Sequence, residues 1–194
     1  LKKYKVLNGY FTDNAIAFYK DVNIGFAVDI DKGLKVLKIP NASDKTMVAI
    51  EEALFSLSNK YLDDILQVED LTDITFTITD LSAEGVGLFY PLVNKNNSAI
   101  LGISAIDEKL QRCTLTLTFD HRVTEGKTAA NFLKELKHRL ESYQFKDGKK
   151  ELDHLFCFKC LKTMKEDLSG IGFLKCITSQ GKEATICQSC VKGF

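Results

Sequence analysis

Alternating apolar and polar residues predict several strands along the chain. In ITFTITDL (74–81), three apolar residues fall on one face and three threonines on the other, and TLTLTFDH (114–121) repeats the pattern. Residues 22–39 form two apolar, β-branched segments around a polar, glycine-containing break, which predicts a hairpin. The apolar run 99–106, entered through a polar turn at 94–97, predicts a further strand.

Two other segments carry apolar residues at spacings of three and four, the pattern of amphipathic helices. The first covers residues 47–61, with Ser43 as its expected N-terminal cap. The second follows Gly126 and presents one apolar stripe that we expect to pack on the sheet. The stripe consists of Ala129, Phe132, Leu133, Leu136, Leu140 and Tyr143.

The charge balance narrows the range of partners. Lys plus Arg and Asp plus Glu both number 26, so no net field draws the protein to nucleic acid or to an anionic membrane surface. No apolar run approaches the roughly 20 residues that cross a bilayer, and the N-terminal residues do not resemble a signal peptide. We therefore expect a soluble protein without nucleic-acid or membrane partners.

Cysteines gather at the end of the chain and predict a metal site. The sequences CFKC and CQSC are two CxxC pairs, and this spacing lets two thiolates from one turn reach a tetrahedral ion at about 2.3 Å. The expected ligands of a structural zinc are Cys157, Cys160, Cys187 and Cys190. Cys176 and His154 are spare candidates, and two disulfides are the alternative explanation of the tail.

These patterns divide the chain into parts. We expect a main domain over residues 1–145, a charged linker over 146–153, and a small zinc-ribbon-like domain over 154–194 with a hairpin that turns near 180–182. Paired cysteines confined to a short tail are typical of a metal site in a reducing compartment, which favours the cytoplasm.

His121 is the candidate for acid–base chemistry. It lies in DHRVTEG, where a predicted strand ends and a predicted helix begins, a place from which side chains can project into a cleft. The four-residue step to Glu125 can bring an imidazole and a carboxylate to the same side of the turn. Asp120 and Arg122 are interpreted as an ion pair that braces the turn, because burying either charge alone is costly.

Four segments, in order, carry a resemblance to a known family. FDHRVTEG followed by AANFLKELKHRLE resembles the HRxxDG motif and last helix of the dihydrolipoamide acyltransferase catalytic domain of 2-oxo acid dehydrogenase complexes. VNIGFAVDIDKGLKV, FTITDL and NKNNSAILGISAI are similar to three earlier segments of that family. The resemblance covers roughly residues 6–143.

The resemblance implies a fold, an activity and roles for two residues. The expected fold is an α+β, chloramphenicol acetyltransferase-like mixed sheet flanked by helices, assembled as a trimer with active sites between subunits. The implied activity is acyl transfer from a thioester, such as coenzyme A or an acyl-lipoyl or carrier-protein arm, to a thiol or hydroxyl. His121 corresponds to the general base, and Thr79 to the serine whose hydroxyl stabilises the oxyanion.

The other threonines of the two alternating strands have a simpler interpretation. We expect them to be β-forming residues on a half-exposed face, without a role in chemistry. They are Thr75, Thr77, Thr114, Thr116 and Thr118.

Departures from the family keep a second function open. Glu125 stands where the family has an aspartate, and the family's opening helix and strands have no counterpart. The alternative to an active enzyme is therefore a non-catalytic acyltransferase-like subunit that serves assembly or docks partners through its zinc ribbon. In either case we expect the domain to be completed by further copies in a homotrimer or by a complementary N-terminal chain, since unpaired sheet edges are normally covered.

Overall fold

A computed structural model describes residues 1–30, 32–143, 173–177 and 183–187. The chain divides into two compact units, Leu1–Tyr143 and Gln144–Phe194, which are described separately.

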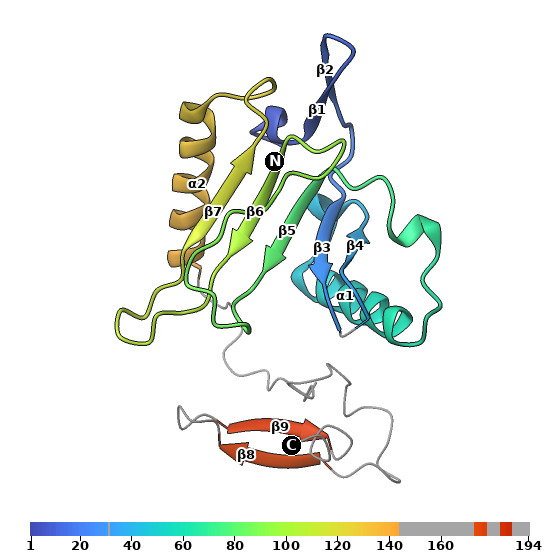
Figure 1. Cartoon of the computed structure of the whole chain (residues 1–194), viewed down its shortest axis with the longest axis vertical. Coiled ribbons are helices and arrows are strands. Elements are labelled where there is room, and N and C mark those ends of the chain that lie inside the picture. The colour runs from blue at the N-terminus through green and yellow to red at the C-terminus, as the bar shows by residue number, and fades with distance from the viewer. Residues whose placement is uncertain (31, 144–172, 178–182, 188–194) are drawn as a thin grey trace. The chain divides into compact units, whose positions relative to one another are not determined.

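Within the described residues of the first unit, five strands form a mixed sheet in the order β4-β3-β5-β6-β7 (Figure 1). Strand β5 runs parallel to both β3 and β6, whereas β4 and β7 are antiparallel to their neighbours. The strands are β3 (Ile24–Val28), β4 (Lys35–Ile39), β5 (Phe76–Asp80), β6 (Ala99–Ile103) and β7 (Leu115–Phe119). The predicted mixed sheet is therefore confirmed, although β6 ends three residues earlier than its apolar run.

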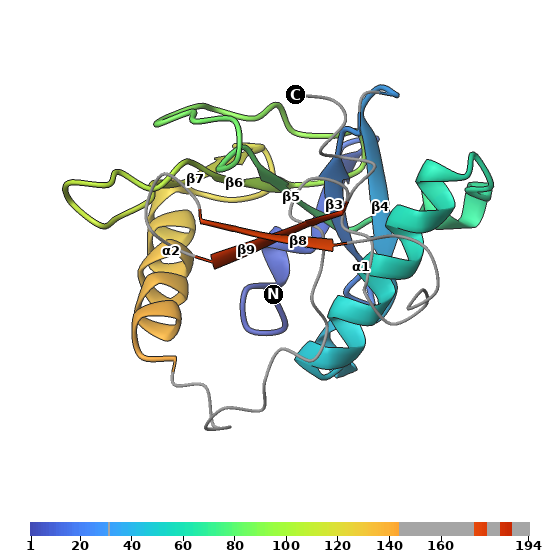
Figure 2. The same cartoon turned by 90° about the horizontal axis from the view of Figure 1, so that it is seen from below.

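Two helices, α1 (Met47–Leu62) and α2 (Gly126–Glu141), lie on the same face of the sheet (Figure 2). Both form where the apolar spacing predicts a helix, but Leu140 and Tyr143, expected in the apolar stripe of α2, are exposed, and Tyr143 lies beyond the end of that helix. A separate ribbon of β1 (Gly9–Thr12) and β2 (Ala15–Phe18) projects from the end of the sheet where β7 finishes (Figure 1). Short 3-10 turns complete this unit at Lys5–Leu7, Ala42–Asp44 and Val68–Asp70.

The core forms between the apolar face of the sheet and α2. Phe76, Ala99 and Leu101 are buried at its centre, and Phe132 of α2 packs edge-on against Phe76. Burying such aliphatic and aromatic side chains contributes about 1.5–3 kcal/mol each, and it is the main force that holds the helix on the sheet. The alternation of apolar and polar residues along each strand thus determines which face of the sheet the helix covers.

On the opposite face of the sheet, three threonine side chains are more buried than the sequence predicts. Thr75, Thr77 and Thr116 are only 1%, 0% and 8% exposed, so the prediction of a half-exposed threonine face is wrong for these three. The segment between β5 and β6 crosses this face, and the Phe89 ring lies so close to Gly102 that an added Cβ would meet it at 2.9 Å. Alternation alone cannot reveal a covering loop, because the loop carries no periodic signal of its own.

The cap predicted for the first helix is also wrong. Ser43 lies inside the 3-10 turn Ala42–Asp44, and the helix begins only at Met47. The cap is Thr46, whose hydroxyl accepts a hydrogen bond from the Ala49 amide at 3.2 Å. A capping side chain must sit immediately before the first helical residue to reach the free amides of the first turn.

In the second unit, β8 (Phe173–Ile177) pairs antiparallel with β9 (Glu183–Cys187), so the two strands of the predicted hairpin are confirmed. Across the described parts of both units, no helix has the length and apolar character needed to cross a membrane.

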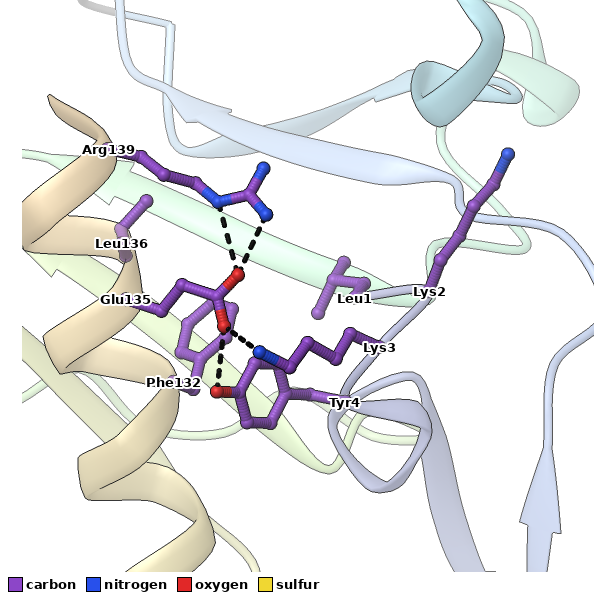
Figure 3. A pocket seen from close by; sticks show the side chains of 8 residues that line it. All are labelled: Leu1, Lys2, Lys3, Tyr4, Phe132, Glu135, Leu136 and Arg139. Carbon is purple, nitrogen blue, oxygen red and sulfur yellow. Dashed lines mark hydrogen bonds and ion pairs between the residues drawn. The ribbon is translucent and has the colours of Figure 1, made fainter. Parts of the chain in front are cut away.

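One polar cluster ties the first residues of the chain to α2. The Glu135 carboxylate accepts hydrogen bonds from Lys3 at 2.5 Å, from the Tyr4 hydroxyl at 3.0 Å and from Arg139 at 2.7 Å (Figure 3). The cluster borders a cavity of about 300 Å³ whose apolar wall includes Phe132. Hydrogen bonds from Lys3, then from Arg139 and Tyr4, lower the pKa of Glu135 to about 2.

This cluster makes stability depend on pH. Because the pKa of Glu135 is lower in the folded protein than in the unfolded chain, its contribution is complete above its ordinary value of 4.5 and is lost as the pH falls toward about 2. We expect Glu135→Gln to lower the thermal midpoint at neutral pH and to flatten its decline between pH 4.5 and 2. Thermal melts across this range test the prediction. Glu141→Gln, which breaks the exposed pair with Lys137, is the matched control and should leave the slope unchanged.

Candidate active site

Backbone hydrogen bonds hold the turn that carries His121. The Asp120 amide donates to the Ser98 carbonyl at 2.8 Å, which extends the β6–β7 ladder by one rung beyond the last paired residues. The Asp120 carbonyl then accepts from the Val123 and Thr124 amides at 2.9 and 3.1 Å, and the chain enters α2. His121 therefore projects from a fixed corner between an edge strand and a helix, as the sequence predicts.

An ion pair braces the same turn, in agreement with its interpretation from the sequence. Asp120 accepts hydrogen bonds from the Arg122 backbone amide at 2.9 Å and from its guanidinium at 2.7 Å. The Arg122 side chain, through its hydrogen bonds, lowers the pKa of the Asp120 carboxyl, and the same contact raises the pKa of Arg122. The guanidinium lies 4.6 Å from the ring centre of Phe11 and so links the turn to the β1–β2 ribbon.

The imidazole and Glu125 are both exposed, but they are not joined. The ring centres of His121 and Phe119 lie 5.5 Å apart, with the two ring planes tilted by 44°. Glu125 is the N-cap residue of α2, with the extended backbone that a cap requires, yet its side chain makes no capping bond to any described residue. Among the residues that the structure describes, no hydrogen bond or ion pair connects His121 with Glu125.

Thr79 lies at the other end of the sheet. It is half-buried in β5, where it pairs with Ala27 of β3 and Gly102 of β6, and Gly102 in turn pairs with Thr116 of β7. His121 follows Thr116 by five residues along an antiparallel strand, which corresponds to a separation on the order of 15 Å along the sheet. One copy of the chain therefore does not bring Thr79 and His121 together.

A polar cavity of about 650 Å³ adjoins the His121 turn, and the sequence did not predict it. Its walls are residues 10–13 of the ribbon, the loop 93–97, Asp120 and Arg122, whereas His121 is not among its lining residues. Within the described residues, no group of three or more His, Cys, Asp or Glu side chains is arranged to hold a metal. Cys157, Cys160 and Cys190 lie outside the described residues, and Cys187 is the last residue of β9.

A mixed sheet with helices on one face and a braced histidine turn at its edge are features of an acyltransferase-type catalytic domain. Residues 1–145 match the family described as 2-oxoacid dehydrogenases acyltransferase (catalytic domain), and the chain belongs to this family.

Relatives agree with this assignment. The chain is 31% identical over 153 residues to the dihydrolipoyllysine-residue succinyltransferase component of the 2-oxoglutarate dehydrogenase complex of Buchnera aphidicola from Schizaphis graminum, covering 74% of this chain and 39% of that protein. It is 34% identical over 151 residues to the acetyltransferase component of the acetoin cleaving system of Bacillus subtilis, covering 73% and 38%. The chain thus spans less than two-fifths of the length of these relatives.

Solved structures share the fold. The dihydrolipoamide acetyltransferase of Azotobacter vinelandii, studied for the role of a serine, a histidine and an asparagine in its catalytic mechanism, is 31% identical with a TM-score of 0.67, covering 73% of this chain and 63% of that one. Its histidine and asparagine are four residues apart, the spacing of His121 and Glu125 here. A probable acetyltransferase from Listeria monocytogenes has a TM-score of 0.70 at 24% identity, over 76% of this chain and 68% of that one.

The uncapped start of α2 gives a prediction. Glu125→Asp shortens the side chain so that its carboxylate can accept from the free amides of the first helical turn, and caps of this kind are worth about 1 kcal/mol. We expect the free energy of unfolding to rise by about that amount in urea titrations. Glu125→Gln has the original length and should give no gain. Equal stability of the aspartate and glutamine variants would contradict the capping explanation.

Proposed function

We propose that this chain is an acyltransferase that moves an acyl group between a thioester carrier and a thiol acceptor. The observation that carries the proposal is the braced His121 turn in a chain that belongs to the acyltransferase family. The named relatives transfer succinyl or acetyl groups on dihydrolipoyllysine residues. We therefore take a dihydrolipoyl thiol and coenzyme A as the two carriers between which the acyl group passes.

The proposed mechanism uses two side chains of this chain. His121 accepts the proton of the attacking thiol as the sulfur forms a bond to the thioester carbonyl carbon. The carbonyl oxygen becomes an oxyanion, to which the Thr79 hydroxyl donates a hydrogen bond. The intermediate then collapses, the original carbon–sulfur bond breaks, and the departing thiolate takes the proton back from His121.

This mechanism requires a site built from more than one chain. Because Thr79 and His121 lie at opposite ends of one sheet, we propose that His121 of one copy meets Thr79 of another within a homotrimer. A relative that is 32% identical, with a TM-score of 0.64 over 73% of this chain and 63% of that one, forms the cubic core of a pyruvate dehydrogenase multienzyme complex. That assembly supports association of the domain with further copies.

The proposal is tested by following acyl transfer with the full-length chain. Dihydrolipoamide is supplied with acetyl-CoA or succinyl-CoA, and both the release of free CoA and the acyl-dihydrolipoamide product are measured. We expect both to appear together, one for one. The proposal would be rejected if neither acetyl-CoA nor succinyl-CoA supported acyl transfer in protein whose oligomeric state is intact.

A non-catalytic subunit remains the second candidate, and Glu125 is the observation that favours it. This residue differs from the asparagine at the same spacing in the Azotobacter enzyme, and it neither caps α2 nor contacts His121 among the described residues. If this departure abolishes activity, Glu125→Asn should restore acyl transfer to an inactive chain. If the chain is an enzyme, the same change should leave its rate within a few fold.

We further propose that Cys157, Cys160, Cys187 and Cys190 bind one structural zinc ion, which implies a reducing compartment such as the cytoplasm. The support is the CxxC spacing together with the position of Cys187, where β9 ends. We expect about one equivalent of zinc in purified protein, and its loss in Cys187→Ser, because metal binding in such sites supplies folding free energy. Cys113→Ser, outside the tail, is the control for elemental analysis. Zinc-free protein whose tail cysteines resist thiol labelling until reduced would indicate disulfides instead.

A further inference from the structure

We propose that Asn97 is a positioning residue for His121, acting through the backbone of Ser98. This inference rests on the proposed function for its catalytic consequence. Its structural part, the coupling of a buried amide to the histidine turn, stands on contacts within the described residues.

The side chain of Asn97 is hydrogen-bonded at both ends of its amide. Its Oδ1 accepts from the Thr77 hydroxyl at 2.8 Å, and its Nδ2 donates to the Ile74 carbonyl at 2.7 Å. Asn97 is 5% exposed and Thr77 is fully buried, so water cannot replace these bonds without opening the core. The Thr77 hydroxyl also accepts a hydrogen bond from the Asn94 side-chain amide at 3.0 Å, which fastens the loop before β6 to β5. We call these three side chains the Asn97 clamp.

One hydrogen bond connects the Asn97 clamp to the histidine turn. Asn97 is followed directly by Ser98, whose carbonyl accepts from the Asp120 amide at 2.8 Å, and Asp120 immediately precedes His121. The Ser98 hydroxyl is buried and has no hydrogen-bond partner among the described residues, so it does not anchor its own backbone. The hydrogen bonds of the Asn97 clamp are therefore the side-chain contacts that hold the backbone next to the Ser98 carbonyl. This carbonyl in turn holds the histidine turn.

A similar pair, formed by the residue just before β5, separates this role from general stability. The Thr75 hydroxyl donates to Asn8 Oδ1 at 2.6 Å, and both residues are buried. Asn8 donates in turn to the Asp21 carbonyl at 2.9 Å, so this pair fastens the base of the β1–β2 ribbon. Thr75→Val, just before β5, and Thr77→Val, within it, thus each remove one buried hydroxyl with almost no change in side-chain volume, but only the second touches the clamp.

The experiment measures amide hydrogen exchange and turnover in the full-length protein. In Thr77→Val, we expect exchange at the Asp120 amide to rise at least tenfold, and kcat to fall about tenfold or more with KM nearly unchanged, because small displacements of a catalytic base lower the rate without weakening ground-state binding. Thr77→Ser, which keeps the hydroxyl, should restore both values. In Thr75→Val, exchange at Asp120 and kcat should stay within a few fold of the parent.

Each outcome decides a separate point. Unchanged exchange at Asp120 in Thr77→Val, or equal losses in the two valine variants, overturns the coupling. Faster exchange with an unaltered kcat overturns the positioning role. If the parent chain transfers no acyl group, the proposed function fails, while the exchange data still decide whether the clamp holds the turn. Should Thr77→Val not fold, Asn94→Ala weakens the clamp from an exposed position and should change both measurements in the same direction, by less.

Discussion

His121→Gln is expected to lower kcat by about 10²- to 10⁴-fold, the usual contribution of a positioned general base. Glutamine has a similar reach and can donate and accept hydrogen bonds, but it cannot take up the thiol proton at neutral pH. Since His121 is exposed and its ring lies beside that of Phe119, its replacement should leave the fold intact. Steady-state rates of acyl transfer and far-UV circular dichroism of the same samples provide the measurement.

His138→Gln is the matched control for this change. It removes an exposed imidazole from the outer face of α2 in the same region of the chain, and it should leave the rate unaltered. A second signature is the dependence of the His121→Gln rate on the pKa of the attacking thiol. Without the base, acidic thiols, which are already thiolates at neutral pH, should lose much less rate than ordinary ones. Comparable turnover in the parent and in His121→Gln would remove His121 from the mechanism.

The elements of the sheet were predictable because their signal is local. Alternation in ITFTITDL and TLTLTFDH reports β5 and β7 directly, and the i, i+3, i+4 spacing reports α1 and α2. The β1–β2 ribbon was missed, although its turn residues Asp13 and Asn14 carried a signal. Both have positive φ angles, 40° and 69°, a conformation that Asp and Asn adopt more readily than most residues and that tight hairpins require.

The candidate site was predictable only in part, because only some of its contacts join residues that are neighbours in the sequence. Asp120, His121 and Arg122 are neighbours in sequence, so a motif can report their ion pair and the turn. In contrast, the hydrogen bond between Thr77 and Asn97 joins residues 20 positions apart in the sequence, and the contact of Arg122 with Phe11 joins residues that are still farther apart in the sequence. Such contacts depend on strand order and direction, which no single segment encodes.

Strand direction also explains why two residues assigned to one reaction lie apart. The family motifs place Thr79 and His121 in the same mechanism, but they do not report that β7 runs antiparallel to β6 and β6 parallel to β5. That arrangement sends the end of β7 away from the end of β5. The separation within one chain and the role of both residues are compatible only if the site forms between chains.

Mixing two inactive variants is therefore expected to restore activity. In a chain with Thr79→Ala, His121 is intact; in a chain with His121→Gln, Thr79 is intact. If each site takes its base from one copy and its hydroxyl from the next, random assembly of equal amounts gives both native groups to about a quarter of the sites, as for any heterologous interface with two independent contributors.

Co-expression with two different affinity tags, followed by purification through both, isolates the mixed oligomers. Their rate per chain should exceed that of either variant alone by at least tenfold, since losing the base or the oxyanion donor separately costs about 10²-fold or more. Replacing the Thr79→Ala chain by the double variant Thr79→Ala/His121→Gln removes every native His121 from the mixture and should abolish the recovery. Mixed oligomers no more active than their parents would show that His121 and Thr79 do not complete one another's sites across an interface.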